Sequence, residues 1–364
     1  MQTLSSEVPG LKAPRATGGE PIASQNWLMA LCGVALCYPL FLRSASSGMQ
    51  SLASTQTVSA RFAVILMTVA ALAAAYAVPM VAALAASRIA RIPELSGEDI
   101  RAYRLAHVVF AAPPLFTATG VVADVLGIGP FDYLIWLVVW LALGLRLWVS
   151  PPVASTRVAR APTARAVAIH GCLALAVLLI FLIAHLGNHT SALWSTTLHR
   201  RTMKMLEHVY RAPVVEPLLL LGMLLLVATG LRLAWRHTVL RSDGYRRLQT
   251  LTGFYLAAFV LSHLTAIVVL ARWQRHVDTG TWAYESAAPA GFLGDVWNTR
   301  LLPHYSLVVW AVLTHVGLGL RGVLRAHGVA DRTANLVARA LSIAGGAASL
   351  AIGAALLGVH FVAS

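Results

Sequence analysis

Nine apolar runs separated by short loops constrain the fold of this chain more than any other feature of its sequence. Each run is close to the roughly 20 residues that a helix needs to cross the hydrocarbon core of a membrane. Helices are expected because they satisfy their own backbone polar groups where no water can do so. The runs cover residues 27–42, 62–86, 103–125, 131–150, 166–188, 213–235, 250–271, 304–325 and 336–362. The sequence therefore predicts an all-α polytopic membrane protein with about nine transmembrane helices.

The composition argues against a soluble protein, since 58% of the 364 residues are hydrophobic and only 12% are charged. A net charge of +14 would suggest nucleic acid as the partner of a soluble chain. Here the basic residues lie in short loops between apolar runs, where they orient helices, so we expect a lipid bilayer and no nucleic acid. The three cysteines, Cys32, Cys37 and Cys172, lie within apolar runs and indicate neither a disulfide framework nor a zinc site.

The distribution of basic residues predicts the topology. The tail and the loops after the second, fourth, sixth and eighth runs hold 19 of the 28 Lys and Arg residues, and the opposite side holds 9. The positive-inside rule then places the N-terminus in the cytoplasm and the C-terminus outside. Residues 1–26 are rich in Ser, Pro, Gly and Ala and are expected to form a flexible tail. A cleaved signal sequence is the alternative for the short first run.

Histidines within the apolar runs are candidate functional residues, because polar side chains are costly in a bilayer. We compared their depths by counting residues from the nearest cytoplasmic arginine. By this count His185 and His263 lie in the outer half of the membrane, whereas His107, His170 and His315 lie in the inner half. The histidines in predicted loops are expected to be solvated bases: His199, His208, His237, His276 and His327.

Two histidines at matched depth on different helices can ligate one haem from opposite sides. His185 and His263 fit this arrangement best by depth. His189 follows His185 by one turn and is an alternative ligand or a partner for a haem propionate. The alternative for each of these histidines is an ordinary hydrogen bond between helices.

Residues 165–364 resemble the five-helix, diheme cytochrome b subunit of succinate:quinone oxidoreductases and fumarate reductases. The resemblance is carried by His170 and then His185 in Phe-Leu-Ile-Ala-His-Leu-Gly-Asn-His. It continues through Leu-Gln-Thr-Leu-Thr-Gly at 248–253, His263 ten residues later, and Leu-Thr-His ending at His315. It implies a cytochrome b-like bundle in this part of the chain, and leaves 27–150 as a four-helix membrane extension of unknown role.

The resemblance implies that His185 and His263 ligate an outer haem b and that His315 is one ligand of an inner haem b. The expected partner of His315 is absent, because Leu226 and Val227 stand where the second helix of the family carries it. Loss of the inner haem is therefore the first expectation, and its replacement by a ligand from His170 or His107 is the second. Thr250 also stands where the family tends to carry arginine, and Arg246 or Arg247 are candidates to replace that arginine.

The resemblance implies electron transfer between a quinone pool and a partner, by a subunit that is itself non-catalytic. The resemblance suggests soluble flavoprotein and iron–sulfur partners on the cytoplasmic face of a bacterial inner membrane. Glu216 is the only acidic residue within the apolar body of a run, and we assign it proton release from quinol as a hypothesis. The alternative is a carboxylate that the helix N-terminus favours. The long segment 272–303 is a candidate cap for the outer end of the bundle.

Two other function classes remain open at this stage. One is a transporter whose histidines line a proton or substrate path, for which a helix kinked at Pro113-Pro114 would be suitable. The other is a haem-free scaffold that keeps a cytochrome-like bundle. A reduced-minus-oxidised absorption spectrum separates both classes from a haem protein.

Overall fold

The computed structural model describes residues 21–150, 162–240 and 242–362, and all the secondary structure of these residues is helical. Eight helical segments are long and apolar enough to cross a membrane, and a bent pair of helices provides a ninth. The predicted fold class of an all-α polytopic membrane protein is confirmed. The spanning segments are Asn26–Leu52, Val58–Ile89, Gly129–Val149, Ala164–Ser191, Val215–His237, Gly244–Gln274, Val296–Ala326 and Asp331–Leu356.

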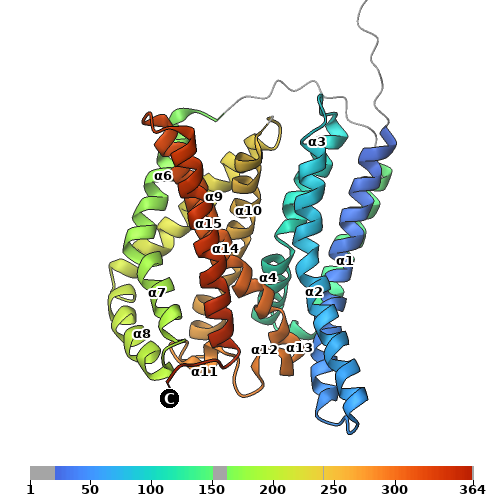
Figure 1. The fold of residues 1–364 in the computed structure, drawn as a ribbon, viewed down its shortest axis with the longest axis vertical. Helices are drawn as coiled ribbons and strands as arrows, with labels where there is room; N and C mark the ends of the chain where they lie inside the picture. The colour runs from blue at the N-terminus through green and yellow to red at the C-terminus, as the bar shows by residue number, and fades with distance from the viewer. Residues whose placement is uncertain (1–20, 151–161, 241, 363–364) are drawn as a thin grey trace, which may run out of the picture.

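The N-terminal half is a bundle whose helices lie side by side (Figure 1). Its elements are α1 (Pro21–Leu52), α2 (Val58–Ile89), α3 (Gly97–Phe110), α4 (Ala112–Val125), the short 3-10 helix η1 (Gly129–Phe131) and α5 (Asp132–Val149). Helix α1 begins five residues before the end of the predicted flexible tail, so the prediction for 21–26 is wrong. The rest of the predicted tail, 1–20, lies outside the described residues.

The third span is broken, as its two adjacent prolines predict. Helices α3 and α4 meet at Ala111 and are bent by 66°. Pro113 and Pro114 lie in the first turn of α4, where the missing N–H groups cost nothing, but neither proline can continue a preceding helix. The start of α3 is equally well defined, since Ser96 and Asp99 form a reciprocal capping box.

The C-terminal half carries the predicted histidine helices. Its long elements are α6 (Ala164–Val177), the π-helical turn η2 (Leu178–Leu182), α7 (Ile183–Ser191), α8 (Thr196–Tyr210), α9 (Val215–His237), α10 (Gly244–Leu264), the π-helical η3 (Thr265–Gln274), α14 (Leu301–Ala326) and α15 (Asp331–Leu356). Three short helices precede α14: α11 (Trp282–Glu285), α12 (Gly291–Gly294) and α13 (Val296–Thr299). Segments α6, η2 and α7 form one continuous span with a π-helical turn between His170 and His185.

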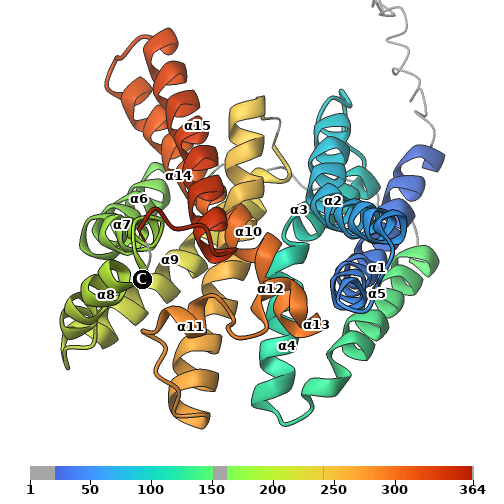
Figure 2. The same cartoon turned by 60° about the horizontal axis from the view of Figure 1, so that its bottom comes forward.

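The two halves share one core. Helix α10 packs against α3 and α4 as well as against α9 and α14, and Figures 1 and 2 both show it between the halves. Tyr255 of α10 is fully buried, stacks edge-on against Phe110 of α3, and donates a hydrogen bond to the carbonyl of Pro303. The extension at 27–150 is therefore a wall of the same bundle.

A buried ion pair also joins the two halves. Arg300, at the start of α14, lies 2.6 Å from a carboxylate oxygen of Asp132, at the start of α5, and both side chains are almost completely buried. The guanidinium lies over the ring of Phe116 at 4.4 Å. A Cβ added at Gly120 would lie 2.2 Å from Nη1 of Arg300, so the close approach of α4 requires glycine there.

Candidate haem and metal sites in the bundle

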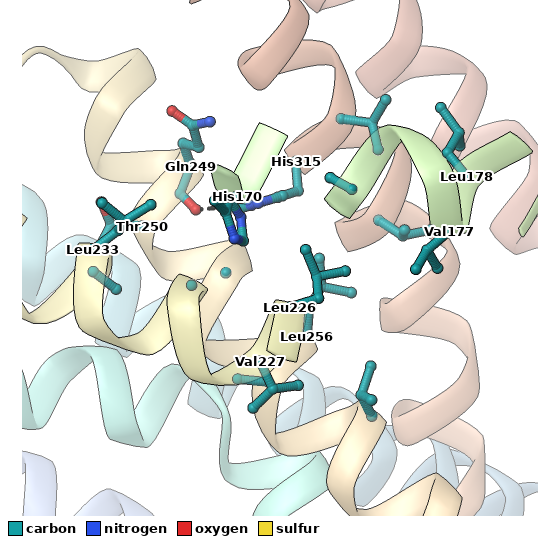
Figure 3. A pocket seen from close by; sticks show the side chains of 18 of the residues that line it. His170, Val177, Leu178, Leu226, Val227, Leu233, Gln249, Thr250, Leu256 and His315 are labelled. Carbon is teal, nitrogen blue, oxygen red and sulfur yellow. Dashed lines mark hydrogen bonds between the residues drawn. The ribbon is translucent and has the colours of Figure 1, made fainter. Parts of the chain in front are cut away.

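The inner pair, His170 and His315, brings together two helices that are distant in sequence. His170 lies on α6 and His315 on α14, and their ring centroids are 6.5 Å apart with the planes at 89° (Figure 3). An imidazole nitrogen binds a metal ion at about 2.0 Å and lies about 1.2 Å from its ring centre, which puts two opposite rings about 6.4 Å apart. The separation of the inner pair therefore matches ligation of one ion between the rings.

Hydrogen bonds set the tautomers of both inner histidines. Nδ1 of His315 lies 3.0 Å from the carbonyl oxygen of Gln249 and must carry the proton. Nδ1 of His170 lies 3.0 Å from the hydroxyl of Thr229, and that hydroxyl already donates to the carbonyl of Leu225. His170 therefore also donates through Nδ1. In this tautomer each Nε2 carries a lone pair, which is the state that a metal ligand needs.

Beside the inner pair is a largely apolar cavity of about 190 Å³ between α6, α9, α10 and α14. Since one water occupies about 10–15 Å³ on this measure, the space holds far more than a single solvent molecule. Figure 3 shows Leu226, Val227 and Leu256 on its wall. Leu226 and Val227, which stand where the resemblance predicts a histidine, therefore contribute aliphatic side chains to the cavity wall.

Two glycines leave room beside the inner imidazoles. A Cβ added at Gly230 would lie 3.0 Å from Cε1 of His170, and one at Gly253 would lie 3.1 Å from Cε1 of His315. Both glycines also line the cavity. A larger residue at either position would displace an imidazole. The two glycines therefore provide the space that the rings of His170 and His315 occupy.

The cavity has polar groups at one end. Arg246, His237, Gln249 and Thr250 line it together with the apolar residues. The Arg246 guanidinium also donates a hydrogen bond to the side chain of Gln249 at 2.7 Å. A cation in this position suits an anionic group such as a carboxylate of a bound cofactor. Arg246, one of the two candidates to replace the arginine expected at Thr250, therefore lies in the lining of this cavity.

His107 does not belong to the inner pair. Its ring is fully buried between Tyr103 and Phe254, and its Nδ1 lies 2.7 Å from the carbonyl oxygen of Tyr103. His170 is instead the histidine that meets His315. Of the two substitutes considered for the missing ligand, only His170 has the required position.

The outer pair, His185 and His263, lies on α7 and α10. The ring centroids are 6.4 Å apart and the planes are at 63°, so this separation also matches one ion between the rings. Phe181 stacks on His185, and Phe259 stacks on His263. Nε2 of His185 differs from the inner nitrogens in facing Nε2 of His189 at 3.3 Å. Ligation of an ion through Nε2 of His185 requires that the contact between this atom and Nε2 of His189 is broken.

A further cluster of titratable groups lies beside the outer pair. Nδ1 of His189 and Nε2 of His199 each lie 3.2 Å from Oε2 of Glu285. His199 is completely buried and stacks edge-on against Trp282, so the prediction of a solvated base is wrong. Burial raises the pKa of Glu285, but the two imidazoles outweigh it and lower the pKa to about 2. The carboxylate is thus ionised throughout the physiological range.

Sequence reasoning missed three residues in this region. Glu285 lies in the segment 272–303, which was expected only to cap the bundle, and it belongs to the short helix α11, which packs against α8. His304 is buried and stacks on Phe259 at 4.5 Å. His199 lies on the amphipathic helix α8, which is too polar for a span. The only sequence signal for the burial of His199 is the helical spacing of apolar residues in α8, which puts His199 on the apolar face of that helix.

Glu216 lies in the first turn of α9 and is bound to Arg272 of η3. One carboxylate oxygen is in contact with Nη1 of Arg272, and the other lies 3.4 Å from Nη2. Both side chains are about one quarter exposed. The pairing supports a role in holding α9 against η3, and the proposed role in quinol chemistry stays a prediction.

No protein-family model matches the chain, and neither a curated protein nor a solved structure is significantly similar to it.

Proposed function

We propose that the protein is a membrane-embedded cytochrome b that carries electrons through two haem groups. One haem would be held between His170 and His315, and the other between His185 and His263. The single observation that carries the proposal is the inner pair. Two imidazoles from separate helices lie 6.5 Å apart, a separation that would admit one iron between them, and no hydrogen bond to either Nε2 is found among the described residues.

Each part of the inner cavity has a role in this proposal. Gln249 and Thr229 fix the tautomers of the two ligands, as hydrogen-bond partners behind metal ligands commonly do. Gly230 and Gly253 leave room beside the rings. Most of the wall is aliphatic, and Arg246 would provide a positive charge for a propionate. When bound, haem supplies a one-electron couple whose potential depends on its ligands and surroundings.

The outer pair extends the proposal across the membrane. His170 and His185 belong to the same span and are fifteen residues apart, which corresponds to about 22 Å along a helix. This length is most of the roughly 30 Å hydrocarbon thickness. Two haems at these depths would therefore form a path for electrons between the two membrane surfaces. His185 would take up its haem by exchanging the contact with His189.

The resemblance to succinate:quinone oxidoreductase subunits supports the identity of the electron partners. We propose a quinone at one end and soluble flavoprotein and iron–sulfur subunits at the cytoplasmic end. In this proposal the chain is the non-catalytic membrane subunit of a complex in a bacterial inner membrane. Its N-terminus would face the cytoplasm and its C-terminus the outside, in line with the excess of basic residues on one side.

The test of this proposal is the reduced-minus-oxidised absorption spectrum of the protein purified after expression with haem supply. We expect the sharp bands of low-spin, bis-histidine haem b. His315→Ala and His263→Ala should each remove part of the band intensity, and the double variant should remove all of it. His327→Ala is the control, because His327 is an exposed histidine just beyond α14. A wild-type protein without b-type bands would contradict the proposal and leave the transporter and scaffold classes.

A further inference from the structure

We propose that His189, His199 and Glu285 form a binding site for a divalent transition metal ion, and that Zn²⁺ is the ion that suits these ligands. The three side chains come from α7, α8 and α11, which meet at the outer end of the bundle. Two imidazoles and one carboxylate form a ligand set that proteins use for zinc with a fourth position left for water. The site is distinct from the two haem pairs and does not depend on them.

The distances between the ligand atoms fit a tetrahedral ion. Ligands at about 2.1 Å from an ion are about 3.4 Å from one another in tetrahedral geometry. Oε2 of Glu285 lies 3.2 Å from Nδ1 of His189 and 3.2 Å from Nε2 of His199. All three atoms lie within 4.8 Å of one another. Two edges of the tetrahedron are therefore in place, and the third, between the two imidazole nitrogens, is no longer than 4.8 Å.

Within the described part of the chain, several buried atoms of this cluster lack a hydrogen bond of normal geometry. His199 is completely buried, and neither of its ring nitrogens has a hydrogen-bond partner in the part of the chain that the structure describes. Oε2 of Glu285 is also without a partner by hydrogen-bond geometry, although both imidazoles are close to it. Buried polar atoms without partners are costly, and an ion accepting their lone pairs would remove that cost.

The proposed ion would not compete with the outer haem for an atom. His189 offers Nδ1 to Glu285, whereas its Nε2 faces His185. The other face of the site is covered by Trp282, which stacks edge-on against both His199 and His360. His360 in turn bonds through Nδ1 to the carbonyl of Ala192. The ion would therefore hold α8 and α11 against the end of α7.

Zn²⁺ titration of chelator-treated protein in detergent, against a competing chromophoric chelator, measures the site directly. We expect one tight site per chain. His199→Ala and the nearly isosteric Glu285→Gln should each weaken binding by at least 100-fold. His208→Ala is the matched control, because His208 lies on the same helix but is exposed, and it should bind as the wild type does. Wild-type binding no tighter than that of His199→Ala would overturn the proposal.

A variant that gains a spectroscopic band, instead of losing metal binding, excludes misfolding as the cause of the result. A thiolate can replace an imidazole as a ligand and gives a charge-transfer band with Co²⁺. His199→Cys should show this band at one Co²⁺ per chain, and His208→Cys should not. Absence of the band from monodisperse His199→Cys protein would overturn the proposal. Since haem content is read separately, loss of the metal site and loss of the haem sites are distinguishable.

Discussion

At the scale of single residues, the chemistry of the inner pair depends on what stands behind each imidazole. A histidine in a membrane helix is not a ligand by its presence alone, since an interhelical hydrogen bond satisfies it equally well. His107 is the example, because its Nδ1 is bound to its own helix and its ring lies between aromatic side chains. His170 and His315 differ because their Nδ1 atoms are hydrogen-bonded, while the described residues provide no hydrogen bond to their Nε2 atoms.

We predict that Gly253→Val removes the inner haem while leaving the chain inserted. The added Cβ would lie 3.1 Å from Cε1 of His315 before the two methyl groups are counted, so the imidazole must move out of position. The haem-to-polypeptide ratio should fall by one. Gly322→Val on α14 is the control, because nothing lies within 4 Å of a Cβ there. An unchanged ratio in Gly253→Val would show that this close contact does not position a ligand.

Glu216 provides a second prediction at this scale. If it releases a proton during quinol oxidation, Glu216→Gln should slow quinol turnover by about tenfold or more while the haem spectrum stays the same. Glu207→Gln is a suitable control, since Glu207 is another carboxylate paired with an arginine, Arg211. Equal turnover in the two variants would leave Glu216 with only its structural contact to Arg272.

At the scale of helices, the sequence predicted spans well and contacts between them poorly. Eight of the nine apolar runs correspond to single spanning helical segments, and the third forms two helices that meet just before Pro113 and Pro114. The depth count correctly put His170 level with His315, but depth carries no direction around the helix axis. That direction depends on packing and on the π-helical turn between His170 and His185, which hydropathy does not reveal. His199 and Glu285 lie outside the spans, where depth gives no information.

The contact of the two halves gives a prediction for stability. Arg300→Met leaves the Asp132 carboxylate buried without a partner, which typically costs about 3–5 kcal/mol. We expect a clear fall in the apparent Tm in detergent. Replacing both residues, as Arg300→Met with Asp132→Leu, should recover part of this loss because no charge then stays buried. Arg332→Met, at an exposed position on α15, is the control. A double variant no more stable than Arg300→Met would contradict this explanation.

At the scale of the whole molecule, a common core joins the 27–150 extension to the histidine helices. The sequence resemblance covers only residues 165–364, and it therefore separated the histidine helices from the extension. In the structure α10 carries both a ligand candidate, His263, on one side and the contacts with α3 and α4 on the other. Removal of the extension would therefore expose the face of α10 that packs against α3 and α4, on the helix that carries His263.

The orientation of the molecule is a prediction at the same scale. Alkaline phosphatase, which is active only outside the cytoplasm, should be active when fused after Ser364. The same reporter should be inactive when fused after His327, one span earlier. The reverse pattern would contradict the predicted topology and would exchange the inner and outer surfaces in the account of electron transfer.

The haem-to-polypeptide ratio of His170→Ala, measured beside the wild type, tests the central claim most directly. We expect a ratio near two for the wild type and near one for the variant, because His170 replaces the ligand that α9 lacks. A wild-type ratio near one that His170→Ala leaves unchanged would contradict it, since the inner pair would then hold no haem.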